Sequence, residues 1–232
     1  CLINDNDTLV FISAIAPCKD EEMYEKNITM IDNFIKGISQ TKISNILYIS
    51  SDAVYEDSMS LISENNNKTS SNMHAKMHKK REEILINYCN TNNLGLTILR
   101  PTLVYGPGDT HNGYGPNQFI RDINNNKDIL LFGEGEEKRD HIYIIDVIQV
   151  IINAIDNQIF GNFTLATGKV FSFYEIAKII CKAKGISESR IKFKKRVGPM
   201  PHNGYRAFNI SELKNNFSNL KMTDIELGIK NS

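Results

Sequence analysis

The chain has 232 residues, enough for one domain with a sizeable core or for one domain with a small lobe. Its 27 basic and 27 acidic residues cancel, which excludes the concentrated positive charge that binds nucleic acids and anionic membranes. No apolar run is long enough to span a bilayer, so we expect neither a nucleic acid nor a membrane as a partner.

The cysteines and the first residue lead to two further expectations. The four cysteines are scattered without a CxxC pair, which favours a reducing compartment over a disulfide framework or a zinc knuckle. No basic-then-apolar leader is present, and we expect a cytoplasmic protein. The chain starts with Cys1 instead of Met, so we expect it to begin partway through a longer protein.

The first hundred residues alternate between strand and helix patterns. Residues 8–13 (TLVFIS) form a short apolar run without alternation, as in a strand that is buried on both faces. The elements that we predict after it are a helix over 20–40, a strand over 45–50, a loop over 56–72, a helix over 73–90 and a strand over 94–99. This order predicts right-handed crossovers and a parallel sheet.

From about Tyr105 the pattern changes. Glycines and prolines fall close together between Gly106 and Pro116, which predicts a loop-rich excursion. Beyond it we predict short strands over 129–132 and 162–165 and helices over 143–156 and 172–184. These elements predict a smaller lobe packed beside the main sheet.

Three motifs carry a resemblance to a known family. They are ISSDAVY at 49–55, LRPTLVYGPG at 99–108, and GEG at 133–135 followed by RDHIYIIDV at 139–147. In this order and spacing they resemble the extended short-chain dehydrogenase/reductase family, and within it the NAD-dependent sugar-nucleotide epimerases and dehydratases. The resemblance runs from about Thr8 to Gly228.

The resemblance implies an α/β fold, a doubly wound, Rossmann-like parallel sheet with a smaller C-terminal substrate lobe. Residues 1–105 would be the C-terminal part of the dinucleotide-binding domain. Residues 106–232 would be mainly the substrate lobe, with some segments returning to the main domain. The chain contains no G-x-x-G-x-x-G phosphate loop, so the first strands of the family fold, on the order of 60 residues, would be missing in front.

The family also implies a cofactor, NAD or NADP, and a nucleotide sugar as substrate. The chain would act as an epimerase, a reductase or a dehydratase. The residues that match positions beside the cofactor are Ser13, Ala14, Ile15, Asn27, Ser50, Pro101 and Thr102.

Family chemistry uses a Ser or Thr hydroxyl, a Tyr that exchanges a proton, and a Lys four residues after the Tyr. Ser51 matches the hydroxyl, but no Tyr occurs between Tyr55 and Tyr88. In the family, a Glu usually follows four residues after the Lys. If Glu82 is this Glu, then His78 occupies the Lys position and His74 occupies the Tyr position.

A competing register, anchored on Glu83, gives Ala75 and Lys79 instead. We favour the histidine register, because His74 and His78 share one helix face with Leu85 and Cys89. That face should point toward the sheet.

Histidine can exchange protons near neutral pH without help from a lysine, since its reference pKa is about 6.5. His74 could replace the Tyr, and His78 could hydrogen-bond ribose hydroxyls; at most one of the two should be charged. Two alternatives stay open. One is a degenerate site that binds ligand without turnover. The other is a metal site at the His-x-x-x-His spacing, which lacks a partner Glu or Cys, so we predict no metal.

Departures from the family pattern limit the reaction and the ligand. Dehydratases carry Thr-Asp-Glu where this chain has Ser51-Asp52-Ala53, so Asp52 is a candidate acid but the base is lost. This makes a standard dehydration doubtful and leaves epimerisation or carbonyl reduction open; Asp52 could also be a turn cap. Arg139 and Gln118 match substrate-binding positions, whereas Leu103 replaces an Asn that commonly contacts the substrate. Family members usually pair through the two long helices, so we expect a homodimer.

Overall fold

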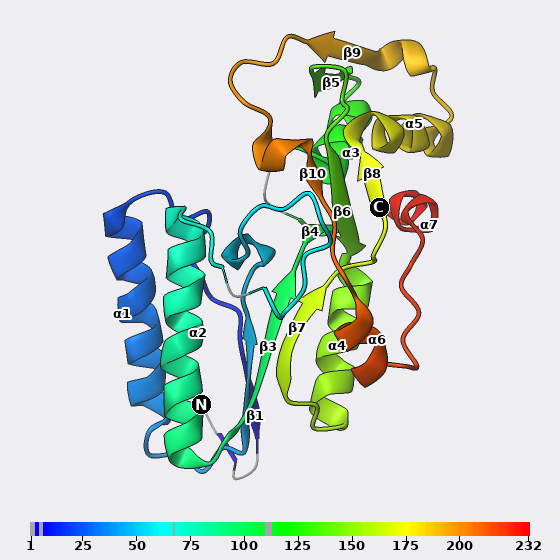
Figure 1. Ribbon diagram of the computed structural model, residues 1–232. Helices are drawn as coiled ribbons and strands as arrows, with labels where there is room; N and C mark the ends of the chain where they lie inside the picture. The colour runs from blue at the N-terminus through cyan, green and yellow to red at the C-terminus, as the bar shows by residue number, and fades with distance from the viewer. Residues whose placement is uncertain (1–2, 5–6, 67, 110–112) are drawn as a thin grey trace.

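The computed structural model describes residues 3–4, 7–66, 68–109 and 113–232. A parallel sheet forms its centre, with strand order β1 (Thr8–Phe11), β2 (Asn45–Ile49), β3 (Gly95–Pro101) and β7 (Gly161–Leu165) (Figure 1). Consecutive residues Ile46, Leu47 and Tyr48 of β2 are all buried, because both faces of the sheet are covered. The predicted parallel sheet is confirmed.

Helices cover both faces of this sheet (Figure 1). On one face, α1 (Glu21–Ile38) and α2 (Met73–Asn92) pack over a cluster that contains Ile46 and Ile98. On the other face, α4 (Ile144–Asp156) and α6 (Ser211–Asn216) pack over a cluster that contains Leu47. The arrangement is the predicted doubly wound one.

Local signals explain where the two long helices begin and end. Asp20 accepts a hydrogen bond from the Met23 backbone at the start of α1, and Asn72 accepts one from Ala75 at the start of α2. Asn93 ends α2 in the left-handed conformation, with φ of 53°. Both helices start at the carboxyl edge of the sheet, where ligands of open α/β sheets bind.

A second group of elements forms the upper part in Figure 1. One of its sheets has the strand order β10 (Tyr205–Arg206), β6 (Lys138–Tyr143) and β4 (Leu103–Tyr105), and β8 (Val170–Ser172) pairs with β6 in the antiparallel direction. A second sheet consists of β5 (Ile129–Phe132) and β9 (Ile191–Lys194). Its helices are α3 (Pro116–Asn124), α5 (Phe173–Lys184) and α7 (Ile225–Lys230), and the short 3₁₀ turns of the chain are η1 (Asp52–Val54), η2 (Glu188–Arg190) and η3 (Pro201–Gly204).

The two parts share segments. β7 lies in the main sheet beside β3, although it follows β6 in the chain. Conversely, β4 follows β3 in the chain but pairs with β6 of the second part. A division at residue 105 therefore remains a prediction, since residues on either side of it contribute to both parts.

No element was predicted between the loop-rich excursion and residue 129, but residues 116–124 form the helix α3. Pro116 occupies the first turn of this helix, and Gly115 precedes it with φ of 141°. The helix is only nine residues long, and it is stabilised by burial of Phe119 and Ile120 rather than by propensity.

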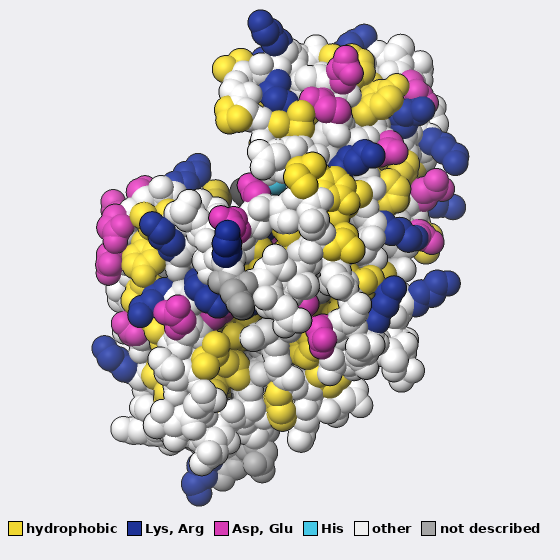
Figure 2. Space-filling view, viewed as in Figure 1, with side chains coloured by type: hydrophobic (Ala, Val, Ile, Leu, Met, Phe, Trp, Pro, Cys, Tyr) yellow, Lys and Arg dark blue, Asp and Glu magenta, His cyan; other side chains and the backbone are white. Residues whose placement is uncertain are grey.

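Charged side chains of both signs are mixed over the visible face, which is hollowed between the ends of α1 and α2 and the upper part (Figure 2). Along the described ranges, no helix is both long and apolar enough to cross a membrane.

Candidate active site

Ser51 lies just past the carboxyl end of β2, where the chain turns into η1. Its hydroxyl oxygen accepts a hydrogen bond from the backbone N–H of Ala53, at 3.1 Å. The side chain is half-buried. A hydroxyl that accepts from the backbone keeps its own hydrogen for another partner, so Ser51 can cap the turn and still donate to a ligand.

His74 is in the first turn of α2 and is half-buried. Its Nδ1 accepts a hydrogen bond from the backbone N–H of Cys18, at 3.3 Å. Burial lowers the pKa of His74, and the nearby carboxylate of Asp52 opposes that shift. The helix α2, which bears His74, packs against the η1 turn at the carboxyl edge of the sheet.

His78 faces inward, as the helix pattern predicted, together with Leu85 and Cys89. It is 4% exposed, and its Nδ1 lies 2.8 Å from the hydroxyl of Tyr48 in β2. Burial, with a smaller contribution from the charges of His74 and Arg81, lowers its pKa to about 3. His78 is therefore neutral at pH 7 and supplies no positive charge to the site.

Arg81, one turn after His78, is a buried cation that sequence reasoning missed. It is fully buried, donates to the backbone oxygen of Ser13 at 2.6 Å, and stacks over the rings of Phe11 and Tyr48 at 4.7 and 5.2 Å. Within the described part of the chain its Nε has no hydrogen-bond partner. In the sequence it reads as one member of the charged run KKREE, which is typical of a solvated face.

Asn27 and Arg81 together hold the segment after β1. The Asn27 side chain accepts from the Ile15 N–H and donates to the Ile15 carbonyl, both at 3.0 Å. Asn27 is fully buried, whereas Ser13 is exposed and Ala14 and Ile15 are half-buried. Asn27 thus positions the segment 13–15, which would meet a cofactor. Within that segment, Ser13 is the residue whose side chain is exposed.

The predicted anchor residue Glu82 is the centre of a buried network. Both of its oxygens accept from the Arg100 guanidinium, at 2.8 and 2.7 Å, and the Ser50 hydroxyl donates to Oε1 at 2.7 Å. Arg100 also donates to the hydroxyl of Tyr55, at 2.9 Å. The Ser50 hydroxyl, which the sequence assigned to the cofactor, is therefore bonded inside the protein, where it ties β2 to α2.

Asp52 is paired with an arginine from the other end of the chain. Arg206 in β10 is 1% exposed and donates through Nε to the Asp52 carboxylate, at 2.7 Å. It also donates to Asp57, at 2.8 Å, and to the carbonyls of Asp52 and Tyr55. The pair holds η1 against the second part of the molecule, so Asp52 is an ion-pair partner in addition to being a turn residue.

The predicted substrate residues lie in the second part. Arg139 in β6 is 9% exposed, pairs with Glu137 at 3.0 Å, and lies opposite Arg206 in the strand register. Arg139 is thus one strand away from the residue that holds Asp52. Gln118 is half-buried on α3.

Pro101 is the last residue of β3, and Thr102 follows it. Pro101 is half-buried and Thr102 is 6% exposed. The Thr102 backbone donates to Leu165 at 3.0 Å, but its hydroxyl has no partner in the described ranges. An unpartnered buried hydroxyl near the carboxyl edge is a polar group that a ligand could satisfy.

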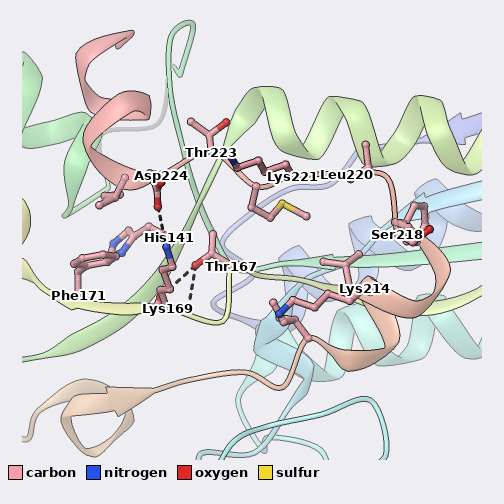
Figure 3. A pocket seen from close by; sticks show the side chains of 15 residues that line it. His141, Thr167, Lys169, Phe171, Lys214, Ser218, Leu220, Lys221, Thr223 and Asp224 are labelled. Carbon is pink, nitrogen blue, oxygen red and sulfur yellow. Dashed lines mark hydrogen bonds and ion pairs between the residues drawn. The ribbon is translucent and has the colours of Figure 1, made fainter.

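A cavity of about 490 Å³ lies elsewhere, beneath the segment that joins α6 to α7 (Figure 3). Lys169 and Asp224 form an ion pair of 2.8 Å at its wall, and His141 lies beside Phe171 (Figure 3). None of the predicted catalytic, cofactor-binding or substrate-binding residues lines it, although His141 belongs to the motif at 139–147. The cavity is therefore separate from the cluster around Ser51 and His74. Within the described ranges no group of three or more His, Cys, Asp or Glu side chains could hold a metal ion.

Comparison with known proteins decides the family. The family model for the NAD dependent epimerase/dehydratase family matches residues 16–164, more than half of the chain. The chain belongs to this family. A curated relative, dTDP-D-glucose 4,6-dehydratase of Dictyostelium discoideum, is 24% identical over 169 residues, which cover 67% of this chain and 39% of the relative. The chain thus spans about two fifths of that relative's length.

Solved structures of the family share the fold. UDP-N-acetylglucosamine 4-epimerase from Methanobrevibacter ruminantium, in complex with UDP-N-acetylmuramic acid, superposes with a TM-score of 0.85 at 21% identity, over 98% of this chain and 76% of that one. A variant of UDP-glucuronic acid 4-epimerase from Bacillus cereus, in complex with a fluorinated UDP-glucuronic acid and NAD, gives a TM-score of 0.82 at 20% identity, over 97% and 73% of the two chains. The predicted Rossmann-like α/β fold is confirmed.

Proposed function

We propose that the protein is an NAD-dependent oxidoreductase of nucleotide sugars, an epimerase or a reductase, in which His74 stands in place of the usual Tyr. One observation carries the proposal: α2, which bears His74, packs against the η1 turn that follows Ser51 at the carboxyl edge of the sheet, and the His74 ring accepts from Cys18, shortly after the segment 13–15. The family is NAD dependent, and a relative of the same fold holds NAD together with a UDP sugar.

The residues have distinct roles in this proposal. Ser13–Ile15, Pro101 and Thr102 face the nicotinamide half of the cofactor, with the free Thr102 hydroxyl available to bind it. When bound, the cofactor supplies or accepts a hydride. Ser51 and His74 hold the reacting oxygen of the sugar. Arg139 binds the diphosphate, and Gln118 contacts the nucleotide.

A dehydratase is less well supported than an epimerase or a reductase. Dehydration needs an acid and a base beside the sugar, and Ala53 replaces the base. The candidate acid, Asp52, is engaged by Arg206 at 2.7 Å.

A second candidate is a binding protein that does not turn over its ligand. It is favoured by the state of His78, which is neutral, buried and bonded to Tyr48. Where the family has a lysine, this position therefore carries no charge. Arg81 puts a buried cation one turn further on, but its guanidinium is directed at the Ser13 carbonyl.

The test is turnover by the full-length protein with NAD(H) and a panel of UDP and dTDP sugars. The enzyme proposal expects a change in cofactor absorbance or in sugar configuration that Ser51→Ala and His74→Ala both abolish. Lys76→Ala, an exposed position on the same helix, is the matched control and should keep full activity. Cofactor binding without any turnover in the parent protein would support the binding protein instead.

We also propose that the protein is a cytoplasmic homodimer that associates through α1 and α2. These helices pack side by side on one face of the sheet, which leaves their outer surfaces free for a second copy (Figure 1). A monomer mass by light scattering at micromolar concentration would refute the dimer.

A further inference from the structure

We infer that His74 works as a neutral hydrogen-bond donor through Nε2–H, and that the substrate therefore arrives as a keto nucleotide sugar that the protein reduces. The inference rests on the proposed function and deepens it, because it names the direction of the reaction and the chemical state of the sugar.

The tautomer of His74 follows from the nature of its partner. The backbone N–H of Cys18 can only donate, so the Nδ1 that it meets at 3.3 Å has to be an acceptor without a proton. A neutral ring with a bare Nδ1 carries its proton on Nε2. The partner of His78 does not fix a tautomer in this way, because the Tyr48 hydroxyl can either donate or accept.

The Cys18 N–H that donates to His74 is held in place by the start of α1. Cys18 is 4% exposed, and its thiol contacts the carbonyl of Asp20 at 3.8 Å. Asp20 in turn caps α1 by accepting from Met23, at 2.9 Å. The N–H that meets His74 is therefore held by the start of one long helix, while the imidazole is held by the start of the other.

The surroundings of His74 keep the ring uncharged. The groups that face it are Asp52 from η1 and His78 from its own helix, whose ring centre is 4.7 Å away. The Asp52 charge favours protonation, but Arg206 neutralises that carboxylate at 2.7 Å. Burial is the larger influence, and it lowers the pKa of His74. A neutral imidazole that polarises a carbonyl is a known catalytic arrangement.

The polar groups at the reacting centre are therefore matched to a carbonyl oxygen. His74 offers Nε2–H, and Ser51 keeps its hydrogen because its oxygen accepts from Ala53. A carbonyl oxygen has two lone pairs and can accept from both. Oxidation of an alcohol needs a group that takes the hydroxyl proton, and Nε2 already carries one.

The step balances as a reduction. The carbonyl carbon gains a hydride, with two electrons, from reduced nicotinamide, which becomes oxidised. The C=O π electrons move to oxygen, where hydrogen bonds from His74 Nε2–H and from Ser51 stabilise the developing negative charge. The alkoxide then takes a proton from water, which leaves as hydroxide. A sugar dehydratase or dehydrogenase must supply the ketone, because this chain lacks the base that its own dehydration would need.

The test combines nitrogen NMR with a comparison of substrates in the full-length protein. With ¹⁵N-labelled histidine, the His74 signals, assigned by their loss in His74→Gln, should show a bare Nδ1 and a protonated Nε2 from pH 7 to 8. A keto nucleotide sugar should consume NADH at least tenfold faster than the parent alcohol reduces NAD, with a rate that is flat over this pH range. His74→Gln, which keeps an N–H donor, should retain more activity than His74→Ala.

Three results would overturn the inference. The first is a proton on Nδ1 or a charged ring at pH 7, and the second is oxidation of the alcohol as fast as reduction of the ketone. Either leaves the proposed function standing. The third is absence of turnover with both sugars, which would defeat the keto substrate and the enzyme proposal together, while the nitrogen shifts would still decide the tautomer.

Discussion

Acid should unfold this protein partly through two buried histidines, His78 and His141. Burial lowers the pKa of each to about 3, and the reference value is 6.5. Because the folded pKa lies below the unfolded one, the stability that each contributes is fully present above pH 6.5 and is lost as the pH falls toward 3. At pH 5 the unfolded histidine binds nearly one proton and the folded one almost none.

The size of this effect follows from the linkage between proton binding and folding. Between pH 7.5 and pH 5, each of the two histidines should cost about 2 kcal/mol of unfolding free energy, or about 4 kcal/mol together. In His78→Gln and His141→Gln the absolute stability falls as well, but the pH-dependent loss should shrink by about 2 kcal/mol in each variant.

The assay is urea unfolding followed by circular dichroism at pH 7.5 and pH 5.0, with Lys76→Ala as the control for a solvent-exposed substitution. The control should lose as much stability on acidification as the parent does. If His78→Gln also loses as much as the parent, then burial does not hold the folded His78 neutral, and the account of its pKa is wrong.

Three further outcomes follow from the buried cations. Glu82→Gln should lower the free energy of unfolding, measured in urea, by about 3–5 kcal/mol, because Arg100 stays buried without its counter-ion. The double variant Glu82→Gln with Arg100→Met should recover part of this loss. Arg206→Met should release the Asp52 turn and lower kcat more than it raises KM, whereas Lys76→Ala should change neither constant. Equal kinetics in Arg206→Met and the parent would show that Arg206 does not position this turn for catalysis. Arg81→Met should weaken NAD binding by calorimetry at least fivefold, since the Ser13 segment loses its 2.6 Å contact, and an unchanged affinity would show that this segment does not meet the cofactor.

The strands and long helices were predictable because their signals are local. The run NILYI gives β2 its two buried faces, and Asp20 and Asn72 mark the helix starts. The helix α3 was not predictable, because its stability comes from Phe119 and Ile120 packing against distant elements. The same holds for β10, whose two residues are a strand only because they pair with β6.

The site was predictable only in part. The motif placed Ser51 and the spacing placed His74 and His78 on an inward face, which the burial confirms for His78. The partners that set their chemistry were not predictable. Arg206 meets Asp52 across 154 positions of the chain, and Cys18 meets His74 across 56, so no local pattern announces either contact.

The most direct measurement follows a deuterium. The full-length protein is incubated with NADH deuterated at the transferable position and with a keto nucleotide sugar, and the sugar product is weighed by mass spectrometry. The account predicts one deuterium in the product of the parent protein and of Lys76→Ala, and almost none with His74→Ala. No label in the parent product, or equal labelling by His74→Ala, would contradict the claim that hydride transfer takes place beside His74.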